Sequence, residues 1–341
     1  MTDLSIIIVN WNSTSYVLDC VKSVYAHTHD IRFEIIVVDN NSPDGDADEV
    51  RQRFPDVVLI KSPENLGFAR ANNLGFQAAK GEMVVFLNPD TVLTNPAFDL
   101  MLQKFRSLPS VGAVGCTLLN HDQSIQTSAI QTFPTALNQL LDIDVIRNRF
   151  PACSLWNIAP LFAGGSEPSQ VEVISGACLM LRREIFARVG MFSDDYFMYA
   201  EDLDLCFKLV RAGYANYFLP QGRIIHFGGK SSNATRATVM KWKSILHYIA
   251  KHRGLAYLFL FRIAMACSAM TRLVVMALWL GARGKMRDDA GRGRLLKWWL
   301  ILKTMAAYSE PAPAARPVSI SGKTGSSVLA HNDEKACLRR G

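Results

Sequence analysis

The sequence predicts an α/β protein with a mostly parallel central sheet flanked by helices. Two observations predict this class. Short apolar runs alternate with helical patterns over the first 120 residues, an order that is typical of βαβ units. These runs are apolar on both faces, as strands are when helices cover both sides of a parallel sheet.

The N-terminal elements follow in a regular order. A first strand is predicted over residues 5–9, and a helix follows it because possible N-caps at 13–15 precede valines at helical spacing. Further strands are predicted over 34–38, 57–60 and 83–87, with a helix over 69–79 before the last of them. Lys80-Gly81 is typical of a helix end.

The pattern is weaker from about residue 125 to 170, where polar residues, Pro and Gly mix. Long loops inside a compact fold often bind ligands or form lids. Regular structure is predicted again over 171–181, followed by helices over 183–189 and 200–212 and a strand over 215–219.

Charge divides the chain into two unlike parts. Residues 1–235 hold 18 Lys or Arg against 25 Asp or Glu, whereas residues 236–341 hold 19 against 5. We expect a catalytic domain over 1–235, basic amphipathic helices over 236–308 and a disordered tail over 309–341, which is rich in Ala, Pro, Ser and Gly. A composition of 49% hydrophobic and 20% charged residues excludes a mostly disordered protein.

The cysteines and the N-terminus indicate the cytoplasm. Seven single cysteines without a CxxC pair give no disulfide framework and no zinc-finger spacing, which suits a reducing compartment. The start is acidic and its apolar run is short, so we expect no signal peptide.

Polar side chains follow three of the predicted strands. These are Asn10, Asp39 and the pair Asn88 and Asp90. Ligands bind outside the carboxyl ends of strands in open parallel sheets. Asn and Asp also favour turns, but three such strand ends at one sheet edge favour a binding site.

Two familiar nucleotide motifs are missing from the sequence. No GxGxxG follows the first strand and no GxxxxGK[ST] occurs, which disfavours a hydride-transfer Rossmann enzyme and a P-loop NTPase. A bound diphosphate would then need a divalent metal ion, and Asp90 is the candidate ligand.

Five segments resemble family 2 glycosyltransferases of the GT-A fold: 6–12, 37–42, 65–75, 86–91 and 201–206. The resemblance covers roughly residues 4–230 and is closest to bacterial rhamnosyltransferases of cell-surface polysaccharide synthesis. It implies an inverting enzyme that moves a sugar from a nucleotide diphosphate to an acceptor hydroxyl. The preferred donor is dTDP-rhamnose, by family analogy.

The resemblance implies specific donor contacts. Asp39 is expected to bind the base of the donor, with Asn10 in the same pocket. Asn65, Arg70 and Asn73 fall in the segment that approaches the ribose and diphosphate.

The resemblance also implies a metal site for Mg²⁺ or Mn²⁺. Asp90 matches the last acid of the family's DxD motif, but Asn88 replaces the first acid, so the site has one carboxylate where two are usual. His226 is a second candidate ligand, because the family often has a metal-contacting His near this position. A lone His is more often structural, so both interpretations stay open for His226.

The candidate catalytic acids lie at a predicted helix start. Asp202 matches the family's proposed base, and Glu201 is expected to support it or to contact the acceptor. The alternative is that these acids only stabilise the helix dipole. Asp204 is expected to be structural, since it lies about 200° from Asp202 on a helix.

The basic region predicts a membrane-surface helix. Residues 255–280 are long and apolar enough to span a bilayer, but Arg262 and Arg272 would each cost about 2.5–3.5 kcal/mol at its centre. Seven Lys or Arg follow within 283–303, around Trp298-Trp299, which fits an anionic cytoplasmic leaflet. A core helix beside a solvated basic helix is the alternative, and nucleic-acid binding lacks any supporting motif.

These expectations combine into one function with two alternatives. The enzyme would act peripherally at the cytoplasmic face of the inner membrane on a lipid-linked or polysaccharide acceptor. A non-catalytic sugar-nucleotide-binding scaffold is the main alternative, because the first metal-binding acid is missing. A nucleotidyltransferase is disfavoured because the N-terminal Gly-rich loop is absent.

Overall fold

The computed structural model describes residues 2–43, 46–141, 149–150, 153, 167–228, 234–283 and 288–309. The predicted disordered tail lies outside the described residues from position 310 onward. Much of the weakly patterned stretch between 125 and 170, and two of the basic residues counted above, Lys285 and Arg287, lie outside them as well.

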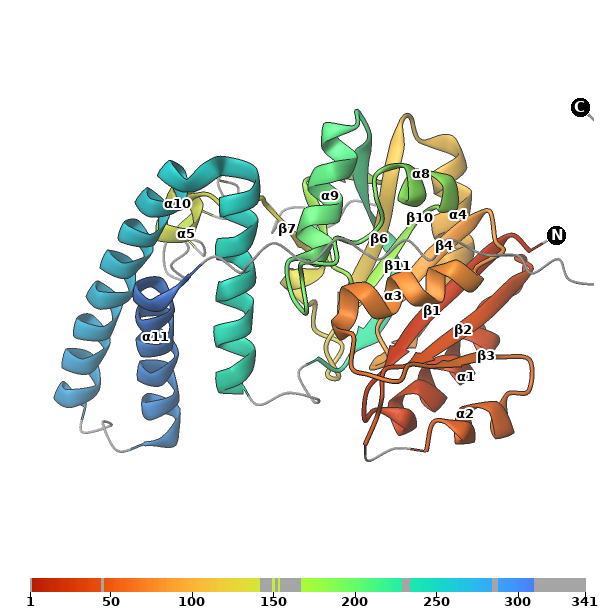
Figure 1. Cartoon of the computed structure of the whole chain (residues 1–341), viewed down its shortest axis with the longest axis horizontal. Coiled ribbons are helices and arrows are strands. Elements are labelled where there is room, and N and C mark those ends of the chain that lie inside the picture. The colour runs from red at the N-terminus through yellow and green to blue at the C-terminus, as the bar shows by residue number, and fades with distance from the viewer. Residues whose placement is uncertain are drawn as a thin grey trace, which may run out of the picture.

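A nine-stranded sheet forms the centre of the described chain, in the order β3-β2-β1-β4-β10-β6-β11-β5, with β8 beside β11 (Figure 1). Its strands are β1 (Leu4–Asn10), β2 (Phe33–Asp39), β3 (Val58–Lys61), β4 (Met83–Leu87), β5 (Thr91–Leu93), β6 (Val111–Leu119), β8 (Ser169–Val171), β10 (Cys178–Arg182) and β11 (Ala215–His226). The pairs β1–β2, β1–β4, β2–β3 and β6–β11 are parallel. The predicted class, α/β with a mostly parallel sheet, is therefore confirmed.

Three strands of the sheet run antiparallel to their neighbours. β10 runs antiparallel between β4 and β6, while β5 and β8 run antiparallel to β11. A separate two-stranded sheet joins β7 (Ile130–Gln131), which follows the short helix η1 (Thr127–Ala129), to β9 (Val173–Ile174).

Helices cover both faces of the sheet, so the protein has two hydrophobic cores. The helices before residue 212 are α1 (Thr14–His27), α2 (Asp48–Arg53), α3 (Gly67–Ala78), α4 (Ala97–Ser107), α5 (Ala136–Leu141), α8 (Arg183–Arg188) and α9 (Glu201–Arg211). Alternation along β1 shows the two faces, because Ile7 packs in the core under α3, α8 and α9 whereas Ile6 and Ile8 pack in the core under α1 and α4.

The predicted strand over 83–87 matches β4, and the helix predicted over 200–212 matches α9 within one residue at each end. The strand predicted over 215–219 is longer in the structure, because β11 continues to His226. Its register with β6 shifts between Leu219 and Arg223. Pro220 and Gly222 lie in this bulge, and because both residue types usually interrupt strands, the sequence pattern predicted an end at residue 219.

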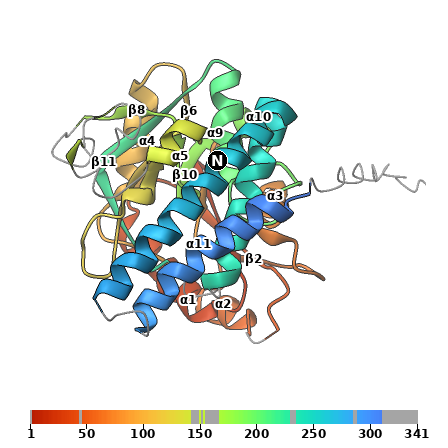
Figure 2. The same ribbon diagram turned by 90° about the vertical axis from the view of Figure 1, so that its left-hand side faces the viewer.

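The chain ends in two long helices, α10 (Ala234–Ala282) and α11 (Asp289–Ala307). Gly254 interrupts α10 with φ 81 and ψ 168. The first half lies beside the part of the chain that contains the sheet, while the second half runs side by side with α11 (Figures 1 and 2). Leu246 and Ile249 of the first half are fully buried in the core that contains α9, and the expected domain limit at 235 stays a prediction.

The second half of α10 turns its arginines inward and its apolar side chains outward. Arg262 donates hydrogen bonds to the carbonyls of Met305 and Ala306, and Arg272 donates to the carbonyl of Leu140 at 3.1 Å. The outward side chains are large and more than half exposed: Leu255, Phe259, Leu260, Met270, Val274, Val275 and Leu278. By length and composition, α10 is the one helix of the described chain that could cross a membrane.

Candidate active site

The carboxyl ends of β1 and β2 form a buried polar pair. Asn10 and Asp39 are neighbours in the β1–β2 register, and the Asn10 side-chain amide donates to Asp39 Oδ1 at 3.0 Å. Ser42 donates to the same Oδ1 at 2.6 Å. Both Asn10 and Asp39 are buried, so the structure brings together two of the residues predicted to bind the donor and fixes their orientation.

A second polar cluster follows β2. The Asn40 side-chain amide donates to Asn65 Oδ1 at 3.0 Å, and Asn65 Oδ1 also accepts the backbone N–H of Gly67. Asn65 thus lies at the start of α3, next to the Asn10–Asp39 pair along the sheet edge. Arg70, one turn further along α3, is half-exposed and lies 3.7 Å from Glu64.

Asn73 points away from that edge. Its amide donates to the carbonyl of Phe192 at 2.8 Å and to Asp194 Oδ1 at 3.0 Å, and its Oδ1 accepts the N–H of Phe192. These bonds join α3 to the loop that precedes α9. Its predicted contact with the donor stays a prediction, while the geometry gives Asn73 a positioning role for that loop.

Asp90 and His226 meet at the end of β4. His226 is the last residue of β11 and pairs with Thr91 in the β5 register. Its Nε2 lies 3.4 Å from Asp90 Oδ1 and 3.3 Å from the amide nitrogen of Asn88. The structure therefore brings together the two predicted metal ligands, although 136 residues separate them.

Gln126 fixes the tautomer of His226. The Gln126 amide nitrogen donates to the His226 backbone carbonyl, so its Oε1 must be the atom that faces His226 Nδ1 at 3.0 Å. Nδ1 then carries the proton, and Nε2 presents a lone pair towards Asp90.

The donor chemistry at this position fits a divalent metal ion. In this tautomer Nε2 can accept the Asn88 amide N–H, and it lies beside the Asp90 carboxylate, so the imidazole nitrogen and the carboxylate oxygen could both serve as ligands of one divalent cation. Among the described residues, no group of three or more His, Cys, Asp or Glu could hold a metal. The protein would supply one imidazole and one carboxylate, and the phosphates of a nucleotide and water would complete the shell.

The acid pair lies at the start of α9. Asp202 Oδ2 accepts the N–H of Gly176 at 2.9 Å, and its Oδ1 accepts the N–H of Leu203 at 2.8 Å. A Cβ at position 176 would lie 3.4 Å from Asp202 Cβ, so position 176 packs directly against the candidate base. Next in the chain, the carbonyl of Ala177 accepts the N–H of Asn88 at 3.0 Å. Residues 176 and 177 thus contact the candidate base on one side and the candidate metal-binding loop on the other.

The two acids differ in their environment. Burial, with a smaller contribution from the charge of Asp202, raises the pKa of Glu201 to about 8. Burial also raises the pKa of Asp202, but the N–H groups of Gly176 and Leu203 and the charge of Lys241 oppose the rise. Glu201 Oε2 is buried without a hydrogen-bond partner among the described residues. At neutral pH, Glu201 is therefore protonated and Asp202 is the better candidate for a base.

A strained loop holds the acid pair in place. Tyr199 and Ala200, directly before Glu201, have φ values of 69 and 66, and such left-handed conformations are costly for residues other than glycine. The loop is fastened on both sides. The carbonyl of Phe197 accepts the N–H of Phe68 on α3, and the carbonyl of Met198 accepts the hydroxyl of Ser244 on α10.

Asp204 faces away from the acid pair into a charged network. Its carboxylate is fully buried and accepts from Ser193 at 2.6 Å and from His252 Nε2 at 2.7 Å, with Lys251 Nζ at 3.1 Å. Burial alone would raise the pKa of Asp204, but the bonds from His252 and Ser193 hold it well below its usual range. Asp204 therefore fastens α9 to α10.

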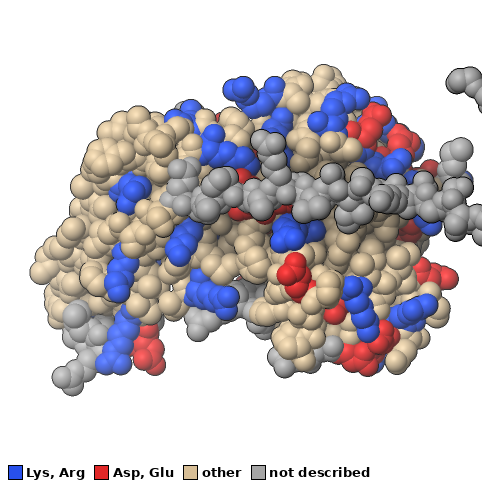
Figure 3. Space-filling model, viewed as in Figure 1, with Lys and Arg blue, Asp and Glu red and all other residues tan. Residues whose placement is uncertain are grey.

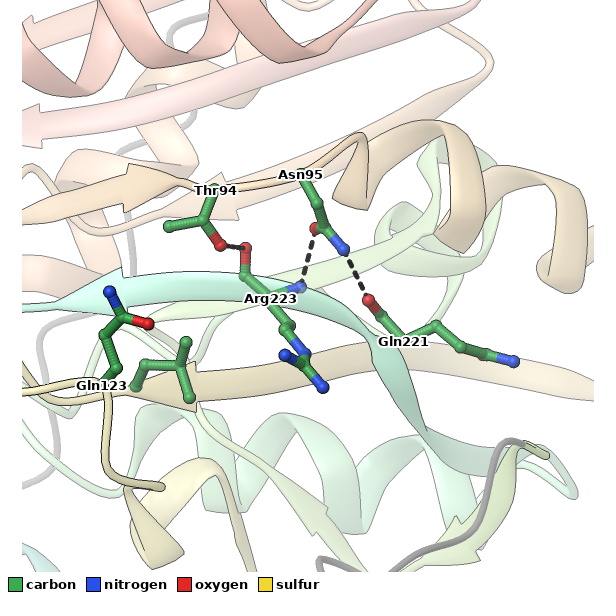
Figure 4. Close-up of a pocket in the computed structure, with 6 residues that line it drawn as sticks. Thr94, Asn95, Gln123, Gln221 and Arg223 are labelled. Atoms are coloured by element: carbon green, nitrogen blue, oxygen red, sulfur yellow. Dashed lines mark hydrogen bonds between the residues drawn. The ribbon is translucent and has the colours of Figure 1, made fainter.

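A separate cavity lies along β11, and hydrogen bonds join several of the residues that line it (Figure 4). Asn95 accepts the N–H of Arg223 at 2.9 Å and donates to the carbonyl of Gln221 at 2.7 Å, while Thr94 donates to the carbonyl of Arg223. These bonds hold the bulge of β11 against β5, so the cavity lining has a structural role.

The family model described as glycosyl transferase family 2 matches residues 5–190. The chain belongs to this family. Family 2 membership thus confirms the resemblance carried by the strand-end motifs. The matched segment contains the Asn10–Asp39 pair and Asp90, whereas Asp202 and His226 lie beyond it.

Curated relatives of this family 2 protein include rhamnosyltransferases. N-acetylglucosaminyl-diphospho-decaprenol L-rhamnosyltransferase of Mycobacterium tuberculosis is 30% identical over 240 residues, covering 66% of this chain and 74% of the relative. Rhamnosyltransferase WbbL of Escherichia coli strain K12 is 23% identical over 265 residues, covering 74% of this chain and 94% of the relative.

A solved structure shares the fold. The mannosyltransferase PcManGT from Pyrobaculum calidifontis, in complex with GDP-Man and Mn²⁺, is similar with a TM-score of 0.57 and 17% identity, covering 90% of this chain and 88% of that one. The predicted GT-A fold is confirmed. The chain is thus a rhamnosyltransferase-like family 2 glycosyltransferase of this fold.

Sequence reasoning missed two residues of the site. Gln126 lies in the weakly patterned region, and no local signal marks it as the partner of His226, 100 residues away. Lys241, whose charge acts on Asp202, belongs to α10 rather than to the predicted catalytic region. Charge alone would not single out Lys241 from the other cations of the basic region.

Proposed function

We propose that this protein is an inverting, metal-dependent transferase that moves rhamnose from dTDP-rhamnose to a hydroxyl of a lipid-linked acceptor in cell-envelope glycan synthesis. The observation that carries the proposal is the bonding of residues 176 and 177, which contact Asp202 on one side and Asn88 of the metal-binding loop on the other. A base and a diphosphate site on two sides of one short segment suit in-line displacement at a sugar carbon.

The donor would bind along the edge formed by β1, β2 and β4. Asp39 and Asn10 would receive the base, while Asn65 and Arg70 at the start of α3 would approach the ribose and diphosphate. A metal ion held by Asp90 and His226, Mg²⁺ or Mn²⁺, would neutralise the phosphate charge that develops as the diphosphate leaves. The solved relative that binds GDP-Man and Mn²⁺ supports this kind of co-substrate and ion.

The acid pair would divide the remaining work. Asp202 would take the proton from the acceptor hydroxyl as that oxygen attacks the anomeric carbon. Glu201, protonated at neutral pH because burial raises its pKa to about 8, can donate a hydrogen bond to the acceptor without competing for its proton. This division follows the rule that paired carboxyl groups with different environments take different roles.

The choice of rhamnose and of a lipid-linked acceptor rests on the relatives. The name of the Mycobacterium tuberculosis enzyme specifies an L-rhamnosyl transfer to N-acetylglucosaminyl-diphospho-decaprenol. At 30% identity over 240 residues, the same type of reaction is the best supported for this chain.

We also propose that α10 and α11 lie on the cytoplasmic face of the inner membrane rather than crossing it. The exposed side chains on the second half of α10 are mostly apolar. α11 runs beside it and exposes Arg292, Arg294, Lys297 and Lys303, each of which would cost about 2.5–3.5 kcal/mol at the bilayer centre. Interfacial placement lets the apolar face enter the acyl region while these cations meet anionic headgroups.

The substitution Asp202→Asn tests the assignment of the base. We expect transfer to fall by about 10²–10⁴-fold, the usual contribution of a general base, while calorimetry shows nearly unchanged donor binding. Asp122→Asn, in an exposed turn, is the matched control and should behave as the wild type. Turnover that survives Asp202→Asn would show that another group is the base.

The alternative of a non-catalytic scaffold predicts a different result. A scaffold would bind sugar nucleotides but would neither hydrolyse nor transfer them with any acceptor. The replacement of the first metal-binding acid by Asn88 favours this alternative, and the intact, differently tuned pair Glu201 and Asp202 opposes it. A donor-hydrolysis assay with dTDP-rhamnose separates the two.

A further inference from the structure

A second site lies between the acid loop and the C-terminal helices. A cavity of about 360 Å³ is lined by Tyr199 of that loop, by both halves of α10 and by α11, in the region where these elements meet in Figure 1. This volume is at the lower end of the ~300–1,000 Å³ range that is typical of small-ligand sites. Nothing in the donor site described above uses it.

The lining of this cavity is cationic. Lys241, Arg272 and Lys297 contribute to it, and none of the described lining residues is acidic. Figure 3 shows Lys and Arg side chains spread over the helical part of the molecule, with acidic side chains there only at its lower end. Guanidinium and ammonium groups together are the usual protein partners of phosphate groups.

One aromatic ring, that of Trp298, lies against two of these cations. The Arg272 guanidinium lies 4.3 Å from the ring centroid of Trp298, and its Nη2 donates to the carbonyl of Leu140. Lys297 Nζ lies 5.7 Å from the same ring. These contacts already restrict the two side chains before any ligand binds. The side chains would therefore lose less conformational entropy when an anion binds in the cavity.

The cavity lies beside the acid pair and away from the proposed donor edge. Tyr199 is two residues before Glu201, and Lys241 lies close enough to Asp202 for its charge to act on that carboxylate. The donor-side residues Asn10, Asp39 and Asp90 are at the strand ends and do not line it.

The lining of the cavity also has an apolar part. Trp242, Ile245, Met265 and Ile301 form its apolar lining. Met265 is buried, whereas Ile263 and Met270 on the same helix belong to the exposed apolar face. A ligand with an anionic head and a hydrocarbon tail therefore finds cations and apolar side chains in the same cavity, and an exposed apolar face on the outward side of the same helix.

We infer that this cavity binds the diphosphate of a polyprenyl-linked acceptor. The tail then lies along the apolar face of α10, and the acceptor sugar extends past Tyr199 to Asp202. This inference rests on the proposed function for the identity of the sugar-bearing acceptor, but the diphosphate site itself can be tested without any sugar.

The test uses farnesyl diphosphate as the probe for the full chain in uncharged detergent micelles. Trp242 and Trp298 line the cavity, so binding is followed by tryptophan fluorescence and by calorimetry. We expect farnesyl diphosphate to bind more tightly than farnesol or inorganic pyrophosphate, because each of these lacks one half of the recognised chemistry. Equal binding of farnesol would overturn the inference, and so would equally effective competition by phosphatidylglycerol, which would indicate a general headgroup site.

Variants then locate the binding. Lys297→Gln and Lys241→Gln should each weaken farnesyl diphosphate binding by about tenfold, as expected for loss of one charged hydrogen bond. Lys303→Gln is the matched control, since it removes the same charge from the same helix outside the cavity. An equal loss in Lys297→Gln and Lys303→Gln would show that only overall charge matters and would overturn the site.

The same preparations keep the two proposals distinguishable. Affinity for dTDP-rhamnose should be unchanged in Lys297→Gln, which also shows that the variant is folded. A protein that binds farnesyl diphosphate through Lys297 but never turns over a sugar nucleotide would refute the proposed function and leave the diphosphate site standing. A protein that transfers sugar equally well to acceptors with and without a diphosphate would refute the diphosphate site and leave the proposed function standing.

Discussion

Glu201 is a buried carboxyl group whose proton has consequences for stability. Its pKa is raised to about 8, chiefly by burial, whereas an unfolded chain would release the proton near the ordinary value of 4.5. The folded state therefore binds more protons than the unfolded state between these pH values. The contribution of Glu201 to the free energy of unfolding is thus largest below a pH of about 4.5. It is lost as the pH rises through 8.

Glu201→Gln should remove this loss. We expect the free energy of unfolding of the variant to exceed that of the wild type increasingly between pH 5 and 8, by on the order of 1–3 kcal/mol at the upper end. Urea unfolding at several pH values measures the difference. Glu184→Gln, at an exposed position on α8, is the control. A difference that does not grow with pH would contradict the assignment of a neutral Glu201.

Gln126 should matter for metal binding although it would not touch the ion. It orients His226 and sets its tautomer, and loss of such an outer partner typically costs about 10–100-fold in metal affinity. We expect Gln126→Ala to weaken Mn²⁺ binding in the presence of a nucleoside diphosphate by that factor, measured by calorimetry.

Gln123→Ala provides the matched amide control for this experiment, because Gln123 lines the cavity beside β5 instead. Asp90→Ala, which removes the one carboxylate ligand, should abolish the Mn²⁺ effect. Wild-type Mn²⁺ affinity in Gln126→Ala would show that His226 is not held for a metal ion.

The residues of the donor edge could be predicted because they follow strands. Sheet topology alone brings Asn10, Asp39 and Asp90 to one edge, so short local patterns were sufficient. Asn73 shows the limit. It sits in a recognised motif, yet its side chain bonds to Phe192, which is 119 residues away. Such a partner depends on how a loop folds back, and a local pattern carries no signal for it.

At the scale of elements, α9 and α10 are joined by buried charge. Asp204 on α9 and Asp195 in the preceding loop both lie within 3.2 Å of Lys251 on α10. Asp204 also bonds His252, and Asp195 bonds His247. The sequence predicted α9 and the C-terminal helix separately, but not this junction, because charge pairing between distant helices has no periodic signature.

Asp204→Asn should loosen this junction. Removing one member of a buried charge network leaves the other charges uncompensated, and we expect a loss of about 3–5 kcal/mol in the free energy of unfolding at pH 7. The pKa of Asp204 is held below its usual range, so this stabilisation is present above the unfolded pKa. It disappears as the pH falls through the folded value.

Hydrogen exchange along α10 would show whether the junction opens in Asp204→Asn, with faster exchange expected in residues 245–252. Asp195→Asn is the control, since Asp195 is only partly buried and its loss should cost less. Equal stability of Asp204→Asn and the wild type would mean that packing alone holds α10 in place.

At the scale of the whole molecule, the acidic and basic parts of the sequence correspond to different surfaces. The predicted amphipathic character of 255–280 has a specific origin, because Arg262 and Arg272 bond to the protein and leave the apolar side exposed. The sequence predicts a polar face and an apolar face on this helix. Which of the two faces packs against the protein depends on α11 and α5, and so on tertiary packing.

Truncation after Arg253 should therefore release the protein from membranes. The full chain is expected to co-sediment with vesicles of phosphatidylcholine and phosphatidylglycerol, and the truncated chain to stay in solution, because the apolar face and the basic helix are both removed. Leu278→Glu on that face should weaken co-sedimentation, whereas Val210→Glu, an exposed apolar position of the catalytic region, should not. Unchanged partitioning of the truncated chain would contradict the membrane assignment.

Gly254 has a consequence for which glycans the enzyme can extend. Its φ of 81 is open to glycine and costly for other residues, although no atom lies within 4 Å of where a Cβ would be. On the membrane surface proposed above, this one backbone angle would set the tilt of the catalytic region over the lipid, and with it the height of Asp202. We expect an enzyme held at one height to favour acceptors of one length, and to act at a fixed step in the growth of its glycan.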